Sequence, residues 1–447
     1  MKIKKVKWDN HPILGNLELD FINDTTRAPF NTIIFVGANG AGKTTILESI
    51  STFLNLGSFE YFEIIEYIID GRVYKATPSN NHRTYYNRTD DKGTVTQCLT
   101  DKKLIDRDTL DIRHYGCIFS KARADYKTAK ITSTTTKTLD LEKYDIDTMD
   151  DFTSSKQLLV DIQTQDSSEY ANINETLGES PKSWPEFYPN SKMYRFKNAF
   201  NQFFDKLKYK KVYDIDSEKQ ILFEKNAKEI SIDKLSTGEK QIVFRGIYLL
   251  KNSKNLNGAT IMIDEPELSM HPKWQKNIMK YYKDLFTEYG AQKTQLFFAT
   301  HSEHVLNEAL KDKNNNLVIV LNEFDGVINA KKIDSPSLLP SITHAEINYF
   351  AFDIVSNDYH IELYSWLQER FDRSTVKSCD TYIQNYMESH NLLNMQKESC
   401  HNKTTYSTLS TFIRNTINHY DSKQASYTDT ELRMSIELLR DIIKQDA

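Results

Sequence analysis

A glycine-rich stretch near the start of the sequence has the residue types and spacing of a phosphate-binding loop. It fits the pattern G-x-x-x-x-G-K-T, in which the glycines let the backbone curl and point its N–H groups at phosphate oxygens. The Lys43 ammonium would reach the β- and γ-phosphates, and the Thr44 hydroxyl would bind Mg²⁺. A helix beginning near Gly42 would add its positive N-terminus. The residues of this predicted nucleotide site are Gly37, Ala38, Asn39, Gly40, Ala41, Gly42, Lys43, Thr44 and Thr45.

Two acidic residues follow one apolar run, and a histidine follows another. Asp264 and Glu265 come directly after residues 260–263, and His301 comes shortly after residues 296–299. Beside a phosphate-binding loop, Asp264 is predicted to hold the Mg²⁺ shell, and Glu265 to orient or deprotonate the attacking water. His301 would donate a hydrogen bond to the γ-phosphate or to that water. Together these residues predict slow, Mg²⁺-dependent hydrolysis of ATP.

The pattern L-S-T-G-E at residues 235–239 precedes another apolar run. Ser236 and Glu239 have the spacing of a capping box, which predicts a helix that starts here with a positive end. By itself this short pattern favours an ordinary capped helix. Its place between a phosphate-binding loop and an acidic strand end instead favours a second nucleotide contact through Ser236, Gly238 and Glu239.

Buried strands and helices must hold these residues in place. Residues 33–36 are apolar and β-rich, and residues 46–54 have apolar side chains at helical spacing. Strands that alternate with helices predict an α/β fold. We expect a P-loop ATPase head over residues 1–343, with a compact inserted lobe at about 57–230.

The last part of the chain, residues 344–447, is predicted to be a helical module. Its apolar residues recur at helical spacing. Aromatic side chains of the kind that anchor interfaces suggest that this module docks a partner, although some of them must be core. These aromatic residues are Tyr349, Phe350, Phe352, Tyr359, Tyr364 and Trp366.

Composition limits the classes of function. The chain has 447 residues, of which 39% are hydrophobic, so it is long enough for two or three domains with real cores. A net charge of −5 argues against coating a nucleic-acid backbone with the whole molecule, although a local basic face is open at residues 206–211. The four cysteines lack C-x-x-C spacing and predict neither a disulfide framework nor a zinc site.

Two observations predict the compartment. The first residues have no apolar signal core, and no run of about 18 apolar residues could span a membrane. We therefore expect a soluble protein in a reducing, cytoplasmic setting.

Along the chain the four motifs follow the order phosphate-binding loop, L-S-T-G-E, Asp264-Glu265 and His301. In this order they resemble the motifs of the ABC-type ATPases, in the RecF/SMC/OLD-like (AAA15) branch. The resemblance covers roughly residues 1–335 and implies the cofactors ATP and Mg²⁺. It also implies a homo-oligomer built from head-to-tail ATP sandwiches, in which Ser236 and Gly238 of one subunit face the nucleotide held by Lys43 of another. The glutamine that this branch carries between its first two motifs has no clear match here; Gln97 and the segment 120–123 are the candidates.

The arrangement also resembles the PtuA family of ATPases from Septu anti-phage systems. The residues that carry this resemblance are the opening segment 11–17, the phosphate-binding loop and the helical tail. The family implies a switch ATPase that gates an HNH nuclease partner, so that any contact with nucleic acid is indirect.

Two alternatives remain open. Arg414 and His419 form an R-N-x-x-x-H hexamer that resembles the HEPN ribonuclease motif, in which a histidine does acid–base work and an arginine stabilises a phosphate transition state. That would make the chain a self-contained, ATP-gated ribonuclease toxin, unless the pair is structural. The other alternative is a RecF-like repair ATPase that binds DNA ends.

Overall fold

The computed structural model describes most of the chain in two compact units, Met1–Lys332 and Ile333–Ala447. The residues that it does not describe are 123–143, 147–152, 179–182, 216–217, 251–256, 289, 334–337, 393–394, 402, 419–425 and 446–447. The division falls before the predicted boundary at 343/344, because the first unit ends with the last strand of its main sheet.

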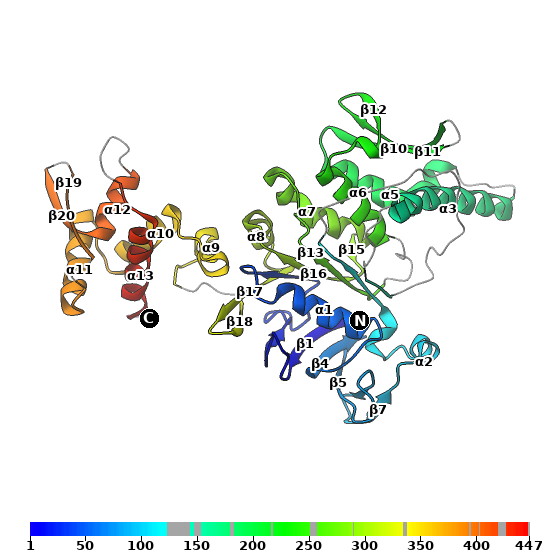
Figure 1. The fold of residues 1–447 in the computed structure, drawn as a ribbon, viewed down its shortest axis with the longest axis horizontal. Coiled ribbons are helices and arrows are strands. Elements are labelled where there is room, and N and C mark those ends of the chain that lie inside the picture. Colours follow the sequence, from blue (N-terminus) through cyan, green and yellow to red (C-terminus); the bar gives the residue numbers. More distant parts are fainter. Residues whose placement is uncertain are drawn as a thin grey trace. The chain divides into compact units, whose positions relative to one another are not determined.

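A mostly parallel sheet is the centre of the first unit (Figure 1). In the described part of the chain it has seven strands, in the order β18-β17-β3-β16-β13-β8-β9. Their bounds are β3 Thr32–Val36, β8 Cys117–Ser120, β9 Tyr144–Ile146, β13 Thr260–Asp264, β16 Gln295–Thr300, β17 Asn316–Phe324 and β18 Val327–Lys332. Strands β3, β13 and β16 are buried along their whole length, as expected for parallel strands covered on both faces. Because they run parallel, their carboxyl ends meet at one edge.

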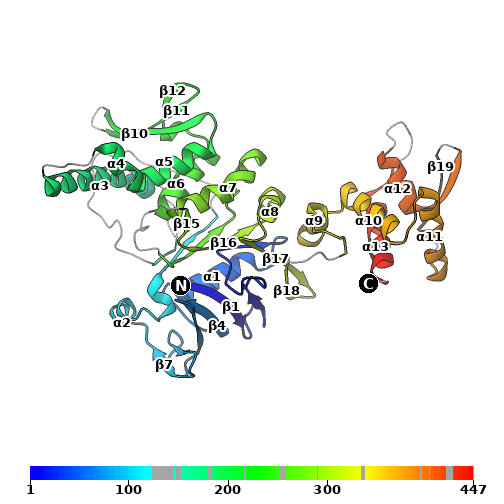
Figure 2. The same cartoon turned by 180° about the vertical axis from the view of Figure 1, so that it is seen from behind.

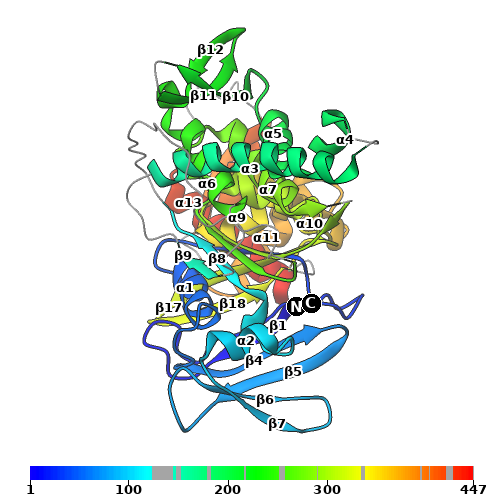
Figure 3. The same ribbon diagram turned by 90° about the vertical axis from the view of Figure 1, so that its right-hand side faces the viewer.

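An antiparallel sheet forms the other layer of this unit, with the order β2-β1-β4-β5-β6-β7. Its strands are β1 Lys2–Trp8, β2 Glu18–Asp20, β4 Phe62–Ile69, β5 Arg72–Pro78, β6 Tyr86–Thr89 and β7 Val95–Cys98. Helix α1 (Lys43–Leu54) packs in the shared core between the two sheets (Figure 3). The stretch predicted as an inserted lobe therefore contributes its first strands to this sheet, because β4 pairs with β1.

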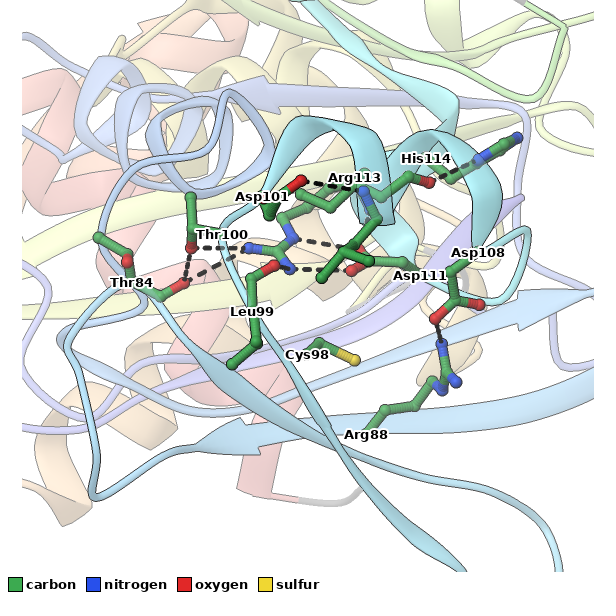
Figure 4. A network of polar contacts seen from close by, with 12 residues as sticks. Thr84, Arg88, Cys98, Leu99, Thr100, Asp101, Asp108, Asp111, Arg113 and His114 are labelled. Atoms are coloured by element: carbon green, nitrogen blue, oxygen red, sulfur yellow. Dashed lines mark hydrogen bonds and ion pairs between the residues drawn. The ribbon is translucent and has the colours of Figure 1, made fainter.

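The short helices α2 (Lys102–Arg107) and η1 (Ile112–Tyr115) follow this sheet, and a buried arginine ties η1 to it. Arg113 pairs with Asp111 at 2.8 Å and donates to the Leu99 carbonyl and the Thr100 hydroxyl (Figure 4). Its guanidinium carbon also lies 4.8 Å from the centre of the Tyr86 ring. Removing one partner would leave a buried charge unpaired, which is strongly destabilising, so this cluster is a structural anchor.

The rest of the lobe is a set of helices and a small three-stranded sheet, in the order β10-β11-β12. These elements are α3 Thr153–Leu177, α4 Trp184–Phe187, η2 Tyr188–Asn190, α5 Lys192–Phe203, β10 Leu207–Ile215, β11 Glu218–Lys225, β12 Lys228–Ser231 and η3 Ile232–Lys234. The helices α6 (Thr237–Leu250), α7 (Pro272–Leu285) and α8 (Glu303–Leu310) follow, with the short hairpin β14 (Thr287–Glu288) and β15 (Ala291–Gln292) after α7.

The second unit has its own apolar core. Figure 2 shows its helices and its hairpin from behind. Its helices are α9 His344–Phe352, α10 Asn357–Arg370, α11 Val376–Ser389, α12 Leu409–Asn418 and α13 Asp429–Gln445, and a hairpin joins β19 (Gln396–His401) to β20 (Thr404–Thr408). Of the predicted docking aromatics, Tyr359 and Tyr364 are buried in this core, while Tyr349 and Trp366 pack at its edge. Tyr359 and Tyr364 therefore stabilise the core of this unit. Because their rings are buried, they cannot anchor a partner.

A buried histidine in this core predicts a loss of stability in acid. His360 is fully buried, with its Nε2 atom 2.9 Å from the Ser435 hydroxyl. Burial lowers the pKa of His360 from 6.5 to about 3. The folded chain therefore keeps this ring neutral at pH values where the unfolded chain protonates it. We expect the free energy of unfolding to fall as the pH drops below about 6.5, by up to about 1.4 kcal/mol per pH unit.

Urea unfolding of the full chain at a series of pH values measures this effect. His360→Gln should weaken the dependence on pH, and His344→Gln, which changes an exposed histidine, should keep it. An unchanged dependence in His360→Gln would show that other groups cause it.

Candidate nucleotide-binding site

The phosphate-binding loop connects the carboxyl end of β3 to the start of α1, as predicted. Two of its glycines, Gly37 and Gly42, occupy positions where a larger residue would be crowded. A Cβ atom on Gly37 would lie 2.3 Å from the Leu321 carbonyl oxygen, and one on Gly42 would lie 2.6 Å from Ile328 Cδ1. Gly42 also has a φ of 84°, in the left-handed region that favours glycine. The fold thus requires these glycines and leaves the loop backbone free to face a phosphate.

The Lys43 side chain lies inside this loop. Its Nζ atom donates hydrogen bonds to the Gly37 and Ala38 carbonyls, each at 2.8 Å, and the residue is 5% exposed. Burial lowers the pKa of Lys43 to about 8, against the opposing effect of the nearby Asp264 carboxylate. The loop thus holds a poorly hydrated cation, and phosphate oxygens would be stronger partners for it than neutral carbonyls.

Thr44 and Asp264 meet at the same edge of the sheet. The Thr44 hydroxyl donates to both carboxylate oxygens of Asp264, at 3.2 and 3.0 Å. Burial raises the pKa of Asp264, which is 5% exposed. A hydroxyl beside one buried carboxylate fits Mg²⁺, which is usually bound by one or two carboxylates together with substrate phosphates. In the described ranges, no group of three or more His, Cys, Asp or Glu side chains could hold a metal ion.

Glu265 and His301 form a close pair next to this site. The His301 Nε2 atom lies 2.6 Å from Glu265 Oε1. This contact lowers the pKa of Glu265 and raises the pKa of His301. The backbone of Glu265 has a φ of 44°, which is uncommon for a residue other than glycine and is typical of strained functional sites. The pair can therefore hold an ionised carboxylate and an imidazole N–H in one place.

Two further residues position these groups and were not predicted. The buried Glu267 carboxylate accepts hydrogen bonds from the Thr300 hydroxyl at 2.6 Å and from the His301 backbone N–H at 3.0 Å. It thereby fixes the chain at the histidine. The sequence signal was its place as the third acid in D-E-P-E.

The second unpredicted residue is Arg245 on α6. Its guanidinium donates to the backbone carbonyls of Asp264 and Glu265, at 2.6 and 2.9 Å. It also donates to the hydroxyl and the carbonyl of Ser120, both at 2.9 Å. A single cation inside an otherwise apolar helical run was the available signal.

The signature motif forms the predicted capped helix. The Ser236 backbone N–H donates to Glu239 Oε2 at 2.8 Å, and the Glu239 N–H donates to the Ser236 hydroxyl at 3.4 Å. A Cβ atom on Gly238 would lie 2.8 Å from the Ser269 carbonyl oxygen. Glycine at this position therefore lets α6 lie close to the loop that follows the acidic pair. Nucleotide contact through this motif remains a prediction.

The two candidates for the missing glutamine lie in different places. Gln97 is on β7, at the edge of the antiparallel sheet, and donates to the Ser79 hydroxyl. Ser120 ends β8 and is bonded to Arg245, which also holds the acidic pair. Of the segment 120–123, Ser120 is thus connected to the candidate site, whereas Arg123 lies outside the described residues.

The predicted ribonuclease pair is described only in part. Arg414 lies on α12 in the second unit and donates to the Asn415 side-chain oxygen at 2.9 Å. His419 lies outside the described residues. The pair therefore remains a sequence-based prediction.

The parallel sheet, phosphate-binding loop, acidic strand end and capped signature helix define an ABC-type P-loop ATPase head, the α/β fold that the sequence predicted. A family model described as "AAA domain, putative AbiEii toxin, Type IV TA system" matches residues 150–307. The chain is 34% identical to the "Retron Vc95 probable ATPase" of Vibrio cholerae serotype O1 biovar El Tor over 110 residues. That match spans 23% of this chain and only 20% of the relative. Over this segment, the chain is thus similar to a protein described as a probable ATPase of a retron.

Solved structures of SMC heads also match. The SMC head domain from Thermotoga maritima aligns with a TM-score of 0.38 and 14% identity, over 75% of this chain and 100% of that one. A Pyrococcus furiosus Smc head bound to the C-terminal domain of ScpA aligns with a TM-score of 0.37 and 13% identity, over 74% and 96%. In the described ranges, no helix has both the length and the apolar character needed to cross a bilayer.

Proposed function

We propose that this chain is a switch ATPase that binds and slowly hydrolyses Mg-ATP. The observation that carries the proposal is the meeting, at one sheet edge, of Thr44 with Asp264 and of Glu265 with His301. Lys43 would bind the β- and γ-phosphates, and Thr44 with Asp264 would hold Mg²⁺, which supplies positive charge to the phosphates when bound.

The chemical step would depend on Glu265. Its carboxylate would take a proton from a water molecule, whose oxygen bonds to the γ-phosphorus while the bond from that phosphorus to the bridging oxygen breaks. ADP would leave with the electron pair of the broken bond. His301 would hold Glu265 in place and donate to the γ-phosphate or the water. Loss of hydrolysis in Glu265→Gln is the test of this step.

We also propose that the active form is a homo-oligomer of head-to-tail dimers. Ser236 and Gly238 lie at the positive start of α6, where backbone N–H groups can receive a phosphate. In the ABC-type arrangement, that phosphate belongs to the ATP held by Lys43 of another subunit.

A bulky cation at this turn should separate binding from hydrolysis. Ser236→Arg should leave the Kd for ATP unchanged, because it spares the subunit's own phosphate-binding loop. It should reduce hydrolysis by about a hundredfold, the cost expected when reacting groups are misplaced. Titration with a fluorescent ATP analogue and phosphate release measure the two effects.

Glu229→Arg, which changes an exposed residue on β12, is the matched control and should hydrolyse ATP normally. A wild-type protein that stays monomeric with ATP in light scattering and remains active would contradict the head-to-tail dimer.

The biological setting that we propose is an anti-phage defence complex of the PtuA kind, in which the ATPase gates an HNH nuclease partner. The relation to a retron ATPase favours a defence system. The second unit is the proposed docking surface, with its half-buried Tyr349 and Trp366 as anchors.

The test is to offer RNA and DNA to the purified chain, with and without ATP, alone and with the product of a neighbouring HNH gene. We expect cleavage only with the partner present. RNA cleavage by the chain alone, lost in both Arg414→Ala and His419→Ala, would establish the ribonuclease alternative instead. DNA-stimulated ATP hydrolysis without cleavage would favour a RecF-like repair ATPase.

A further inference from the structure

A buried carboxylate stands directly behind the signature turn. The Glu239 side chain is 4% exposed, and each of its oxygens has a partner. Oε2 accepts from the Ser236 backbone N–H at 2.8 Å, and Oε1 lies 2.7 Å from the Lys225 Nζ atom. Thus Glu239 shapes the turn, and Lys225 balances the charge of Glu239.

Lys225 comes from the lobe and not from the ATPase core. It is the last residue of β11, where it pairs in register with Leu207 of β10 and Lys228 of β12. The side chain of Lys225 is 39% exposed, so its ammonium reaches from the surface of the lobe into the first turn of α6.

A second lysine of the lobe pairs with a residue that lies just before this turn. Lys156 on α3 is 2% exposed and pairs with Asp233 at 2.9 Å. Asp233 lies in η3, which ends directly before the signature motif. Ion pairs to two separate elements of the lobe therefore hold the signature turn and the short helix η3 that precedes it.

The charge at this turn matters if the turn receives a phosphate. The Ser236 hydroxyl and the free N–H groups of α6 would contact an anion, and the Glu239 carboxylate lies in the same helical turn. An uncompensated buried carboxylate there would repel the phosphate, and loss of its cation partner would leave the negative charge in a poorly screened site. Lys225 removes this repulsion.

We propose that Lys225 is a positioning residue for the trans nucleotide contact: it neutralises Glu239 and keeps the Ser236 turn able to accept the γ-phosphate. This inference rests on the proposed head-to-tail ATPase. It assigns the lobe a part in the reaction, because a movement of β11 away from α6 would withdraw the cation and weaken closure of the heads.

The variants Lys225→Met and Lys225→Arg test this role. Lys225→Met should bind ATP with the wild-type Kd, because the phosphate-binding loop is untouched. It should lower kcat and ATP-dependent dimerisation by about tenfold, the size expected for one charge-assisted hydrogen bond. Lys225→Arg should keep most of both activities. Lys228→Met, the same change on an exposed lysine of the same sheet, is the matched control and should behave as wild type.

A double variant distinguishes charge balance from simple support of the fold. Glu239→Gln keeps the oxygen that accepts from Ser236 but removes the negative charge. Adding Lys225→Met to Glu239→Gln should then have little further effect, whereas a packing role would give the same loss in both backgrounds and overturn the proposal. Wild-type kcat and dimerisation in Lys225→Met would overturn it too. A wild-type protein that neither hydrolyses ATP nor dimerises with it would instead overturn the proposed function, and this inference with it.

Discussion

Lys43→Ala is expected to abolish measurable binding of Mg-ATP. The Lys43 ammonium is the cation inside the phosphate-binding loop, where it now bonds two loop carbonyls. Its removal deletes the charged hydrogen bonds to two phosphates, which contribute about 3 kcal/mol or more to binding. This loss corresponds to a rise in Kd of at least about a hundredfold. Titration with a fluorescent ATP analogue measures the change.

Lys311→Ala is the matched control, because Lys311 is an exposed lysine that pairs with Glu308 at the surface. It should bind ATP as the wild type does. If Lys43→Ala kept the wild-type Kd, the loop would not be the nucleotide site, whatever its shape.

The core of the candidate site could be predicted from the sequence because its residues follow buried strands. Asp264 and His301 come at the ends of two apolar runs, and Thr44 follows the loop after a third run. Parallel pairing brings those three runs to one edge. The apolar runs and the polar residues that follow them were sufficient here, because the order and direction of the strands decide which residues meet at the edge of the sheet.

Arg245 and Glu267 could not be predicted in the same way, because their roles depend on partners far away in the sequence. Arg245 reaches Ser120 across 125 positions, and Glu267 reaches Thr300 across 33. No short sequence motif predicts which buried backbone carbonyl an arginine will contact. The same limit explains why Lys225 was not connected with the signature motif.

The antiparallel sheet illustrates a different limit. The aromatic and β-branched stretch 59–77 predicts strands, but the pairing of β4 with β1 depends on which sheet edge is free. The polar stretch that follows was predicted as loops, and the structure forms β6 and β7 there. In the second unit, helical spacing predicted the helices, whereas the hairpin of β19 and β20 is built from polar, β-branched residues without a strong apolar alternation. The burial of Tyr359 and Tyr364 follows from packing between helices, which the sequence alone does not give.

Glu265→Gln is expected to leave ATP binding intact and to stop hydrolysis. Glutamine keeps the size of the side chain and an oxygen that can accept from His301, but it cannot take a proton from water. The loss of a general base corresponds to a fall in kcat of about a hundredfold to ten-thousandfold. ATP-bound dimers should therefore accumulate, because closure of the heads precedes the blocked step; phosphate release and light scattering measure the two effects.

The matched control is Glu303→Gln, which changes an exposed glutamate at the start of α8, close in sequence to His301. Its kcat should equal that of the wild type. Three results are possible for Glu265→Gln, and each has a different meaning. Lost hydrolysis with dimers that persist in ATP supports Glu265 as the base. Lost hydrolysis without dimers means that Glu265 is needed to close the heads. A wild-type kcat means that the water is activated by another group, and the close contact of Glu265 with His301 would then serve only to position the histidine.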